Sequence, residues 1–179
     1  MKVIFLDIDG VMNGSDEIVD LIKNHGKNGI EATFPTDAKC KLLKQLVDET
    51  EAKIVLSSTW RLHSSGLRDL KVTFEPHNLK LFDRTCHQVP ASRFEGTKYS
   101  SIVPLQTYKY HEHSESVIGD RGAEIASWLL DHPDVESFVI LDDEAYDICP
   151  WFPQNLVKTN TKIGLLEEHI KKAKEILNN

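Results

Sequence analysis

The first dozen residues place the tightest constraint on what this chain can fold into. An unbroken apolar run occupies residues 3–6 and is typical of a strand buried on both faces of a parallel sheet. The run stops at Asp7 and Asp9, which flank Ile8 and, with the two-residue period of a strand, project to one side. Gly10 then allows a sharp turn of the backbone. We therefore expect a buried strand whose carboxyl end carries two acids.

Two carboxylates this close repel each other unless a cation neutralises them or one of them carries a proton. Hard oxygen ligands at the end of a strand suit Mg²⁺, with room for a phosphate as a remaining ligand. Asp7 and Asp9 are therefore candidate metal ligands, and Gly10, in the turn, is a candidate substrate-binding residue. The alternative is a hairpin turn at Asp9 and Gly10, but such turns rarely follow an all-apolar strand.

A second apolar strand is expected over residues 53–56, and it too is followed by polar groups at Ser57, Ser58 and Arg61. Hydroxyl and backbone N–H groups at a strand end can bind phosphoryl oxygens, and an arginine can add a bidentate contact. These three residues are candidate substrate-binding residues. The alternative is a helix cap, because serine and threonine are also good capping residues. An acidic strand end elsewhere in the chain favours the phosphate-binding interpretation.

A third apolar strand over residues 137–141 ends in Asp142 and Asp143, and Asp147 follows four residues after the second of these acids. Burying such a density of negative charge is too costly without a cation. Two acidic strand ends in one chain therefore favour a shared divalent ion. Asp142 and Asp143 are both predicted metal ligands, with no choice between them.

Helical periodicity and capping residues predict four helices between and after these strands. They cover residues 15–24, 37–50, 123–132 and the C-terminus from about Thr161, and a short edge strand is expected over 156–158. Strands that alternate with helices indicate an α/β fold with a parallel sheet flanked by helices. We expect a single domain over 1–179, with a small flap at 13–35 and an insert of short strands and loops at 63–117 that flanks or covers the site.

These parts indicate phosphoryl chemistry. Asp7 is placed to attack phosphorus as a nucleophile and to form an aspartyl-phosphate. Asp9 would protonate the leaving alcohol and then deprotonate a water. Mg²⁺ would be held by Asp7, a backbone carbonyl near Asp9, and the Asp142/Asp143 pair. Arg121, at the start of a helix that packs next to the third strand, is the candidate cation for the transferring oxygens.

The motifs DIDGV, VLSS and VILDDEAYD, with a basic residue that opens a helix before the last of them, resemble the four motifs of the haloacid dehalogenase (HAD) superfamily of phosphohydrolases. More narrowly, DGVMN, SSTWR, RGAEIASWL and GLLEEHIKKAKEIL are similar to the HAD domain of the Swiss Army Knife RNA repair-like proteins. The resemblance implies a HAD-like Rossmannoid sheet with small or minimal cap insertions, and a Mg²⁺-dependent phosphomonoester hydrolase. It implies Asp7 as nucleophile, Asp9 as general acid and base, Ser57 as phosphate ligand, and Asp142, Asp143 or both on the metal.

Two features depart from the superfamily pattern. Most members carry lysine where Arg121 stands, and Lys98 is the reserve candidate for that role. The large movable cap of many members has no counterpart before Ser57, so the insert at 63–117 would take its place. An open or lightly capped site accommodates bulky substrates, and by this analogy the substrates include nucleotide or nucleic-acid-end phosphates.

Composition limits the setting in which this chemistry would occur. A net charge of −7 argues against broad, non-specific binding of nucleic acid. Three cysteines without CxxC spacing argue against a disulfide framework or a zinc ribbon. The start of the chain is too short and too acidic for a signal peptide, and no run approaches membrane-spanning length. We therefore expect a cytoplasmic protein whose partner is a phosphorylated small molecule or a nucleic-acid end, with no membrane and no stable protein partner; export by another signal would leave the same pattern.

Two other functions stay open at this point. A phosphotransferase would use the same residues, and product analysis with an alcohol in place of water would identify it. A non-catalytic phosphate-binding or interaction module is expected to have lost Asp7 or Asp9, and both are present.

Overall fold

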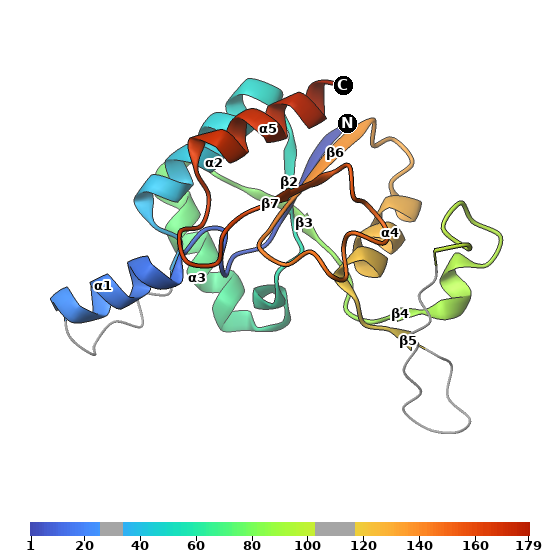
Figure 1. Ribbon diagram of the computed structural model, residues 1–179, viewed down its shortest axis with the longest axis horizontal. Helices are drawn as coiled ribbons and strands as arrows, with labels where there is room; N and C mark the ends of the chain where they lie inside the picture. The colour runs from blue at the N-terminus through green and yellow to red at the C-terminus, as the bar shows by residue number, and fades with distance from the viewer. Residues whose placement is uncertain (26–33, 103–116) are drawn as a thin grey trace.

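A five-stranded parallel sheet forms the centre of the molecule, with the strand order β3-β2-β1-β6-β7 (Figure 1). The computed structural model describes residues 1–25, 34–102 and 117–179. The strands of this sheet are β1 (Lys2–Leu6), β2 (Lys53–Leu56), β3 (Leu81–Arg84), β6 (Ser137–Asp142) and β7 (Leu156–Lys158). The predicted α/β architecture is confirmed, and β7 is the predicted edge strand.

The register of the three central strands brings their carboxyl ends to the same level. Leu6 of β1 pairs with Leu56 of β2 on one side and with Leu141 of β6 on the other. The residues immediately after these three lie at one edge of the sheet, and they are Asp7, Ser57 and Asp142. Parallel pairing in this register is therefore what gathers side chains that are far apart in the sequence.

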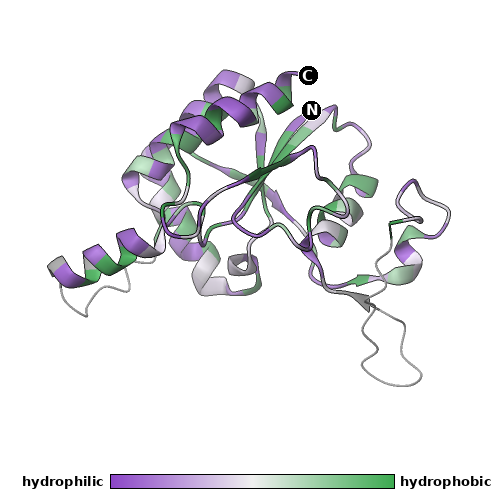
Figure 2. Cartoon of the chain, in the orientation of Figure 1, coloured by the Kyte–Doolittle hydropathy of each residue, from purple (hydrophilic) through white to green (hydrophobic). Residues whose placement is uncertain are grey.

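Both faces of the sheet are buried, because successive residues of each strand point into opposite layers. Ile4 and Leu6 belong to one buried apolar cluster, and Val3 and Phe5 belong to the other. The continuous apolar runs of the sequence reflect this burial on two sides. In Figure 2 the central strands are accordingly mostly hydrophobic, while the outer surfaces of the helices are mostly hydrophilic.

Helices supply the two layers that cover the sheet. On one face lie α2 (Asp37–Thr50), α3 (Ser64–Phe74) and α5 (Glu167–Asn178), and on the other lies α4 (Arg121–Asp131) (Figure 1). Leu43, Ile170 and Phe74 are among the residues that the first group of helices buries. Trp128 of α4 packs edge to face on Phe5, with ring centroids 5.3 Å apart. Within the described residues, no helix combines the length and apolar character needed to cross a membrane.

The flap predicted at 13–35 contains α1 (Ser15–His25), which projects from the body of the molecule (Figure 1). Its first turn is fixed by main-chain hydrogen bonds, because the amides of Ser15 and Asp16 donate to the carbonyls of Thr161 and Lys162. Residues 26–33 of this predicted flap lie outside the described residues.

The prediction of an insert at 63–117 is wrong for its first part, up to the end of β3 at Arg84. Residues 64–74 form α3 and residues 81–84 form β3, so this stretch extends the main sheet and its helical layer. Short elements follow: β4 (Val89–Pro90) pairs with β5 (Val117–Ile118) in an antiparallel ladder beside α4. Only the part after β3 therefore remains an insert, and residues 103–116 of it lie outside the described residues.

Two predicted helix starts also need correction. The helix expected from Ala123 begins at Arg121, because Asp120 caps it through a hydrogen bond of 2.6 Å from the Ala123 amide. The helix expected from about Thr161 begins at Glu167. Before it, the chain turns at Gly164, whose φ of 74° lies in the left-handed region. The turn lets Leu165 donate its amide to the Val11 carbonyl of the loop after β1.

Candidate active site

The candidate active site lies where the central strands end. Asp7 follows β1, is 6% exposed, and donates its amide to the Leu141 carbonyl of β6 at 3.0 Å. On the other side, the Ser57 amide donates to the Leu6 carbonyl at 3.0 Å. The ladder thus continues one residue beyond the strands, and it fixes the backbone at the two positions that carry candidate functional groups.

Three carboxylates gather at this edge. Oxygen atoms of Asp7, Asp142 and Asp143 lie within 4.8 Å of one another. Burial raises the pKa of Asp142 to about 7, and the neighbouring charge of Asp7 adds to this shift. Burial also raises the pKa of Asp7, although the Arg121 guanidinium opposes the shift. The cluster therefore carries an electrostatic cost that a divalent cation would relieve.

One buried oxygen in the cluster accepts no hydrogen bond from the described residues and has only an ion-pair contact, with Arg121 Nε at 3.5 Å. The Asp142 Oδ1 atom accepts the Glu144 amide at 2.9 Å, whereas its Oδ2 atom has no hydrogen-bond partner among the residues that the structure describes. Asp143 is oriented by Thr161, whose hydroxyl donates to its Oδ2 atom at 2.6 Å. A set of hard carboxylate oxygens, one of which accepts no hydrogen bond, fits a cation such as Mg²⁺. Both acids of the predicted pair thus lie where they can hold one.

A pH dependence of stability follows from the raised pKa of Asp142. Between about pH 4 and pH 7 the folded protein binds more protons than the unfolded chain, so the stability of the metal-free protein falls as the pH rises. In the presence of a chelator, which keeps the protein metal-free, we expect the melting temperature of the protein to fall by roughly 5 to 10 °C between pH 5 and pH 7.5.

Calorimetry with and without Mg²⁺ would test this expectation. Saturating Mg²⁺ should remove most of this fall in melting temperature, because the bound ion favours the charged form of the carboxylates. Asp142→Asn should flatten the profile in chelator, while Asp120, whose pKa burial raises to about 6, should contribute a smaller part with the same sign. A flat profile for the unmodified protein in chelator would contradict the interpretation.

Gly10 is required for the shape of the loop. Its φ is 73°, and a Cβ atom at this position would lie 2.2 Å from Asp143 Oδ2. Its amide donates to the main-chain and side-chain oxygens of Asn13, at 3.0 and 3.2 Å. The predicted sharp turn is confirmed, but the amide is used within the loop. The structure therefore gives Gly10 a spacing role beside Asp143, and its contact with substrate stays a prediction.

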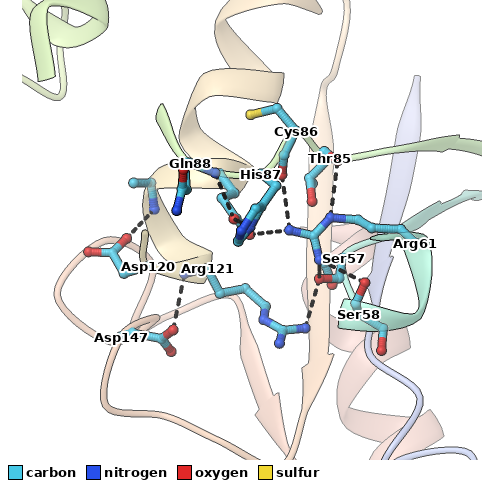
Figure 3. Close-up of polar contacts among 12 residues, drawn as sticks. Ser57, Ser58, Arg61, Thr85, Cys86, His87, Gln88, Asp120, Arg121 and Asp147 are labelled. Carbon is cyan, nitrogen blue, oxygen red and sulfur yellow. Dashed lines mark hydrogen bonds and ion pairs between the residues drawn. The ribbon is translucent and has the colours of Figure 1, made fainter. Parts of the chain in front are cut away.

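Arg121 lies between the two strand ends that carry the acids. Its Nη1 atom donates to Asp7 Oδ1 at 2.7 Å and to the Ser57 carbonyl at 2.8 Å, and its Nε atom is 3.5 Å from Asp142 Oδ2. Asp147 accepts the Arg121 amide at 3.0 Å and so fixes the start of α4 (Figure 3). Arg121 therefore lies beside Asp7 and Asp142, and its role with the transferring oxygens stays a prediction. The reserve candidate Lys98 instead has its ammonium 5.0 Å from the centroid of the Tyr99 ring.

Asp9 lies at the exposed rim of the site. Its Oδ1 atom accepts Asn13 Nδ2 at 3.1 Å, and its Oδ2 atom accepts Trp60 Nε1 at 2.9 Å. These two donors fix the carboxylate where a leaving group can reach it. The carboxylate is not part of the three-membered acidic group identified among the described residues, so a metal contact from Asp9 would come from its main-chain carbonyl.

Ser57 and Ser58 are both fully buried in the loop after β2. Ser58 is engaged, because its hydroxyl accepts the Trp60 amide at 3.4 Å and forms a hydrogen bond with Asp7. The Ser57 hydroxyl has no hydrogen-bond partner in the described part of the chain. A buried hydroxyl without a partner among the described residues, on the residue whose carbonyl accepts a hydrogen bond from Arg121, is the feature expected of a phosphate ligand.

The predicted contact of Arg61 with substrate is wrong. Arg61 is 4% exposed, and its five N–H groups are used within the protein (Figure 3). The acceptors are four main-chain carbonyls and one carboxylate, belonging to Ser57, Ser58, Thr85, Cys86 and Glu124. Arg61 therefore holds the loop after β2 against the loop after β3 and against α4, and it has no donor left for a phosphate.

Sequence reasoning missed several residues that orient the site. Asn13 and Trp60 hold Asp9, Thr161 holds Asp143, and Glu124 pairs with Arg61. Glu124 carried a usable signal, because a single acid in the otherwise apolar stretch of α4 indicates a buried partner of opposite charge.

Comparison with known proteins agrees with this geometry. A family model described as the HAD domain in Swiss Army Knife RNA repair proteins matches residues 3–170, a range that includes all of the five-stranded sheet except Lys2, the first residue of β1. The chain has no significant match among the curated proteins or among the solved structures. The match covers nearly the whole chain and contains every acid of the site. The chain therefore belongs to the family of HAD domains in Swiss Army Knife RNA repair proteins.

Proposed function

We propose that this protein is a Mg²⁺-dependent phosphomonoester hydrolase that works through an aspartyl-phosphate on Asp7. The family supports a phosphatase-type hydrolase in general. The observation that carries the finer proposal is that Arg121 Nη1 contacts both Asp7 Oδ1, at 2.7 Å, and the carbonyl of Ser57, whose own hydroxyl has no hydrogen-bond partner in the described residues. Nucleophile, cation and a hydroxyl-bearing residue thus meet at one edge of the sheet, where a phosphoryl group would bind.

The carboxylates of Asp7, Asp142 and Asp143, with the main-chain carbonyl of Asp9, would hold the ion. The Asp142 Oδ2 atom, which is buried and accepts no hydrogen bond from the described residues, supports this assignment. When bound, Mg²⁺ supplies charge neutralisation, so that an anionic carboxylate can approach an anionic phosphate.

In the first half-reaction, an oxygen of Asp7 forms a bond to phosphorus while the bond to the leaving oxygen breaks. The electron pair stays on the leaving oxygen, which takes a proton from the Asp9 carboxyl group. Arg121 donates hydrogen bonds to the transferring oxygens in place of Asp7. In the second half-reaction, Asp9 takes a proton from water, the water oxygen bonds to phosphorus, and Asp7 is released together with inorganic phosphate.

Metal dependence provides the direct test. With p-nitrophenyl phosphate, we expect hydrolysis that requires Mg²⁺ and stops in excess EDTA. Asp142→Asn should raise the Mg²⁺ concentration for half-maximal activity by at least about 10-fold, because it replaces a charged ligand oxygen with a neutral one.

A matched control is Asp134→Asn, at an exposed acid just before β6, which should leave the Mg²⁺ titration unchanged. Undiminished hydrolysis in EDTA, or an unchanged titration for Asp142→Asn, would contradict the proposal. For the substrate class we propose a nucleotide or a phosphorylated nucleic-acid end, and a panel of phosphorylated metabolites, nucleotides and oligonucleotides would test it.

A further inference from the structure

A hollow of about 310 Å³ adjoins the site on the side of Asp9. Residues from four segments line it: the loop after β1, the stretch before α2, the loop after β2, and the first turns of α3. They are Asp9, Phe34, Thr59, Trp60, His63, Ser65, Gly66 and Asp69. Its volume is at the lower end of the range for small-molecule pockets, about 300 to 1,000 Å³, so it suits one ring system and its substituents.

The walls of this hollow, called the pocket from here on, combine aromatic rings with hydrogen-bond acceptors. The rings of Phe34 and Trp60 meet at 72° with centroids 6.5 Å apart. Gly66 lets α3 approach closely, because a Cβ atom there would lie 2.7 Å from the Trp60 carbonyl. Asp9 and Asp69 contribute carboxylate oxygens. This chemistry fits a planar aromatic group that carries N–H or O–H donors and no charge of its own.

The position of Asp9 connects the pocket to the reaction. A general acid must touch the leaving oxygen, so the leaving group has to extend from phosphorus past Asp9. Asp9 is itself a wall of the pocket, and Trp60 both fixes its Oδ2 atom and contributes a ring to the same space. The leaving group that accepts the proton of Asp9 would therefore occupy the pocket.

We propose that the pocket binds the nucleoside part of the substrate, with its base against Phe34 and Trp60 and its amino and hydroxyl donors toward Asp9 and Asp69. This inference rests on the proposed phosphomonoester hydrolase. It makes Phe34 and Trp60 specificity-determining residues, because they act on the leaving group and not on the phosphoryl group. A free nucleotide and the terminal nucleotide of a strand present the same nucleoside to this space.

The test compares kcat/KM for adenosine 5′-monophosphate and ribose 5-phosphate, which share the leaving oxygen but differ by the base. Stacking of one base predicts a preference of about 5- to 150-fold for the nucleotide. Phe34→Leu should lower this ratio several-fold, whereas Phe82→Leu, at an aromatic residue 51% exposed on β3, should leave it unchanged. A ratio near one, or a ratio that Phe34→Leu does not lower, would overturn the proposal.

Binding without turnover separates this proposal from the proposed reaction. In the Asp7→Asn variant, adenosine alone should quench tryptophan fluorescence in a saturable manner, and the added substitution Trp60→Phe should abolish the saturable part. Saturable quenching with no hydrolysis by the unmodified protein would support the pocket and contradict the reaction. Hydrolysis without quenching would contradict the pocket alone.

A 5′-phosphorylated trinucleotide distinguishes the two sources of the nucleoside. A higher kcat/KM for the trinucleotide than for the mononucleotide would identify a strand end as the substrate, and the reverse would identify a free nucleotide. In both cases the proposal requires Phe34→Leu to lower the preferred value, and a value that stays unchanged would overturn it.

Discussion

Asp7→Asn is expected to lower the turnover of p-nitrophenyl phosphate by about 10⁴-fold or more, because an amide cannot act as the nucleophile that forms the acyl phosphate. Asp7 is 6% exposed and contacts Arg121, the cation proposed to bind the transferring oxygens. The loss should appear in kcat, since the proposed contacts of Ser57 and Arg121 with the phosphate do not require the negative charge of Asp7.

The same variant should remain folded. Burial raises the pKa of Asp7, so a neutral side chain of the same shape removes a cost from the metal-free protein. We expect the melting temperature of Asp7→Asn in chelator at pH 7.5 to equal or exceed that of the unmodified protein. Asp48→Asn, at an exposed acid that pairs with Lys44 on α2, is the matched control and should change neither quantity. If Asp7→Asn keeps normal turnover, Asp7 is not the nucleophile.

The strand ends were predictable from sequence because burial on both faces gives an unbroken apolar run. Residues 3–6, 53–56 and 137–141 each show this pattern, and in a parallel sheet their carboxyl ends meet at one edge. The positions of Asp7 and Asp142 follow from that geometry alone. The separation of 135 positions between Asp7 and Asp142 in the sequence does not predict their proximity, because the parallel register of β1 and β6 brings the two acids together.

The strand β3 could not be predicted in this way. It is an edge strand with one partly buried residue, Leu81, followed by three exposed ones, so no apolar run marks it. The adjoining helix α3 did carry a signal, since Leu67, Leu70 and Phe74 recur at helical spacing and pack in the core. The prolines and scattered aromatic residues that follow α3 made the whole segment look irregular, so this short helical spacing was missed.

The role of Arg61 was not accessible from local sequence. An arginine four residues after Ser57 is compatible both with a phosphate contact and with a buried ion pair, and its partner Glu124 lies 63 residues later. Only the contact between α4 and the loop after β2 shows which of the two interpretations applies. The two interpretations differ in their energetic consequences, and stability measurements can therefore distinguish them.

Arg61→Leu is expected to lower the free energy of unfolding by about 3 to 5 kcal/mol, because it leaves the buried carboxylate of Glu124 without its cation. Both side chains are 5% exposed or less, so solvent does not replace the lost partner. Urea unfolding followed by circular dichroism would measure the loss. Arg93→Leu provides the matched control: its ion pair with Asp131 is exposed, and its removal should cost about 0 to 1 kcal/mol.

The double variant Arg61→Leu/Glu124→Leu separates the ion pair from the remaining contacts. Removing both charges should recover part of the stability, because the uncompensated carboxylate is gone. Full recovery is not expected, since the carbonyls of Ser57, Ser58, Thr85 and Cys86 still lose their donors. If Arg61→Leu were no more damaging than Arg93→Leu but raised KM for phosphate esters, Arg61 would be a substrate ligand and the structural role argued from its five hydrogen bonds would be wrong.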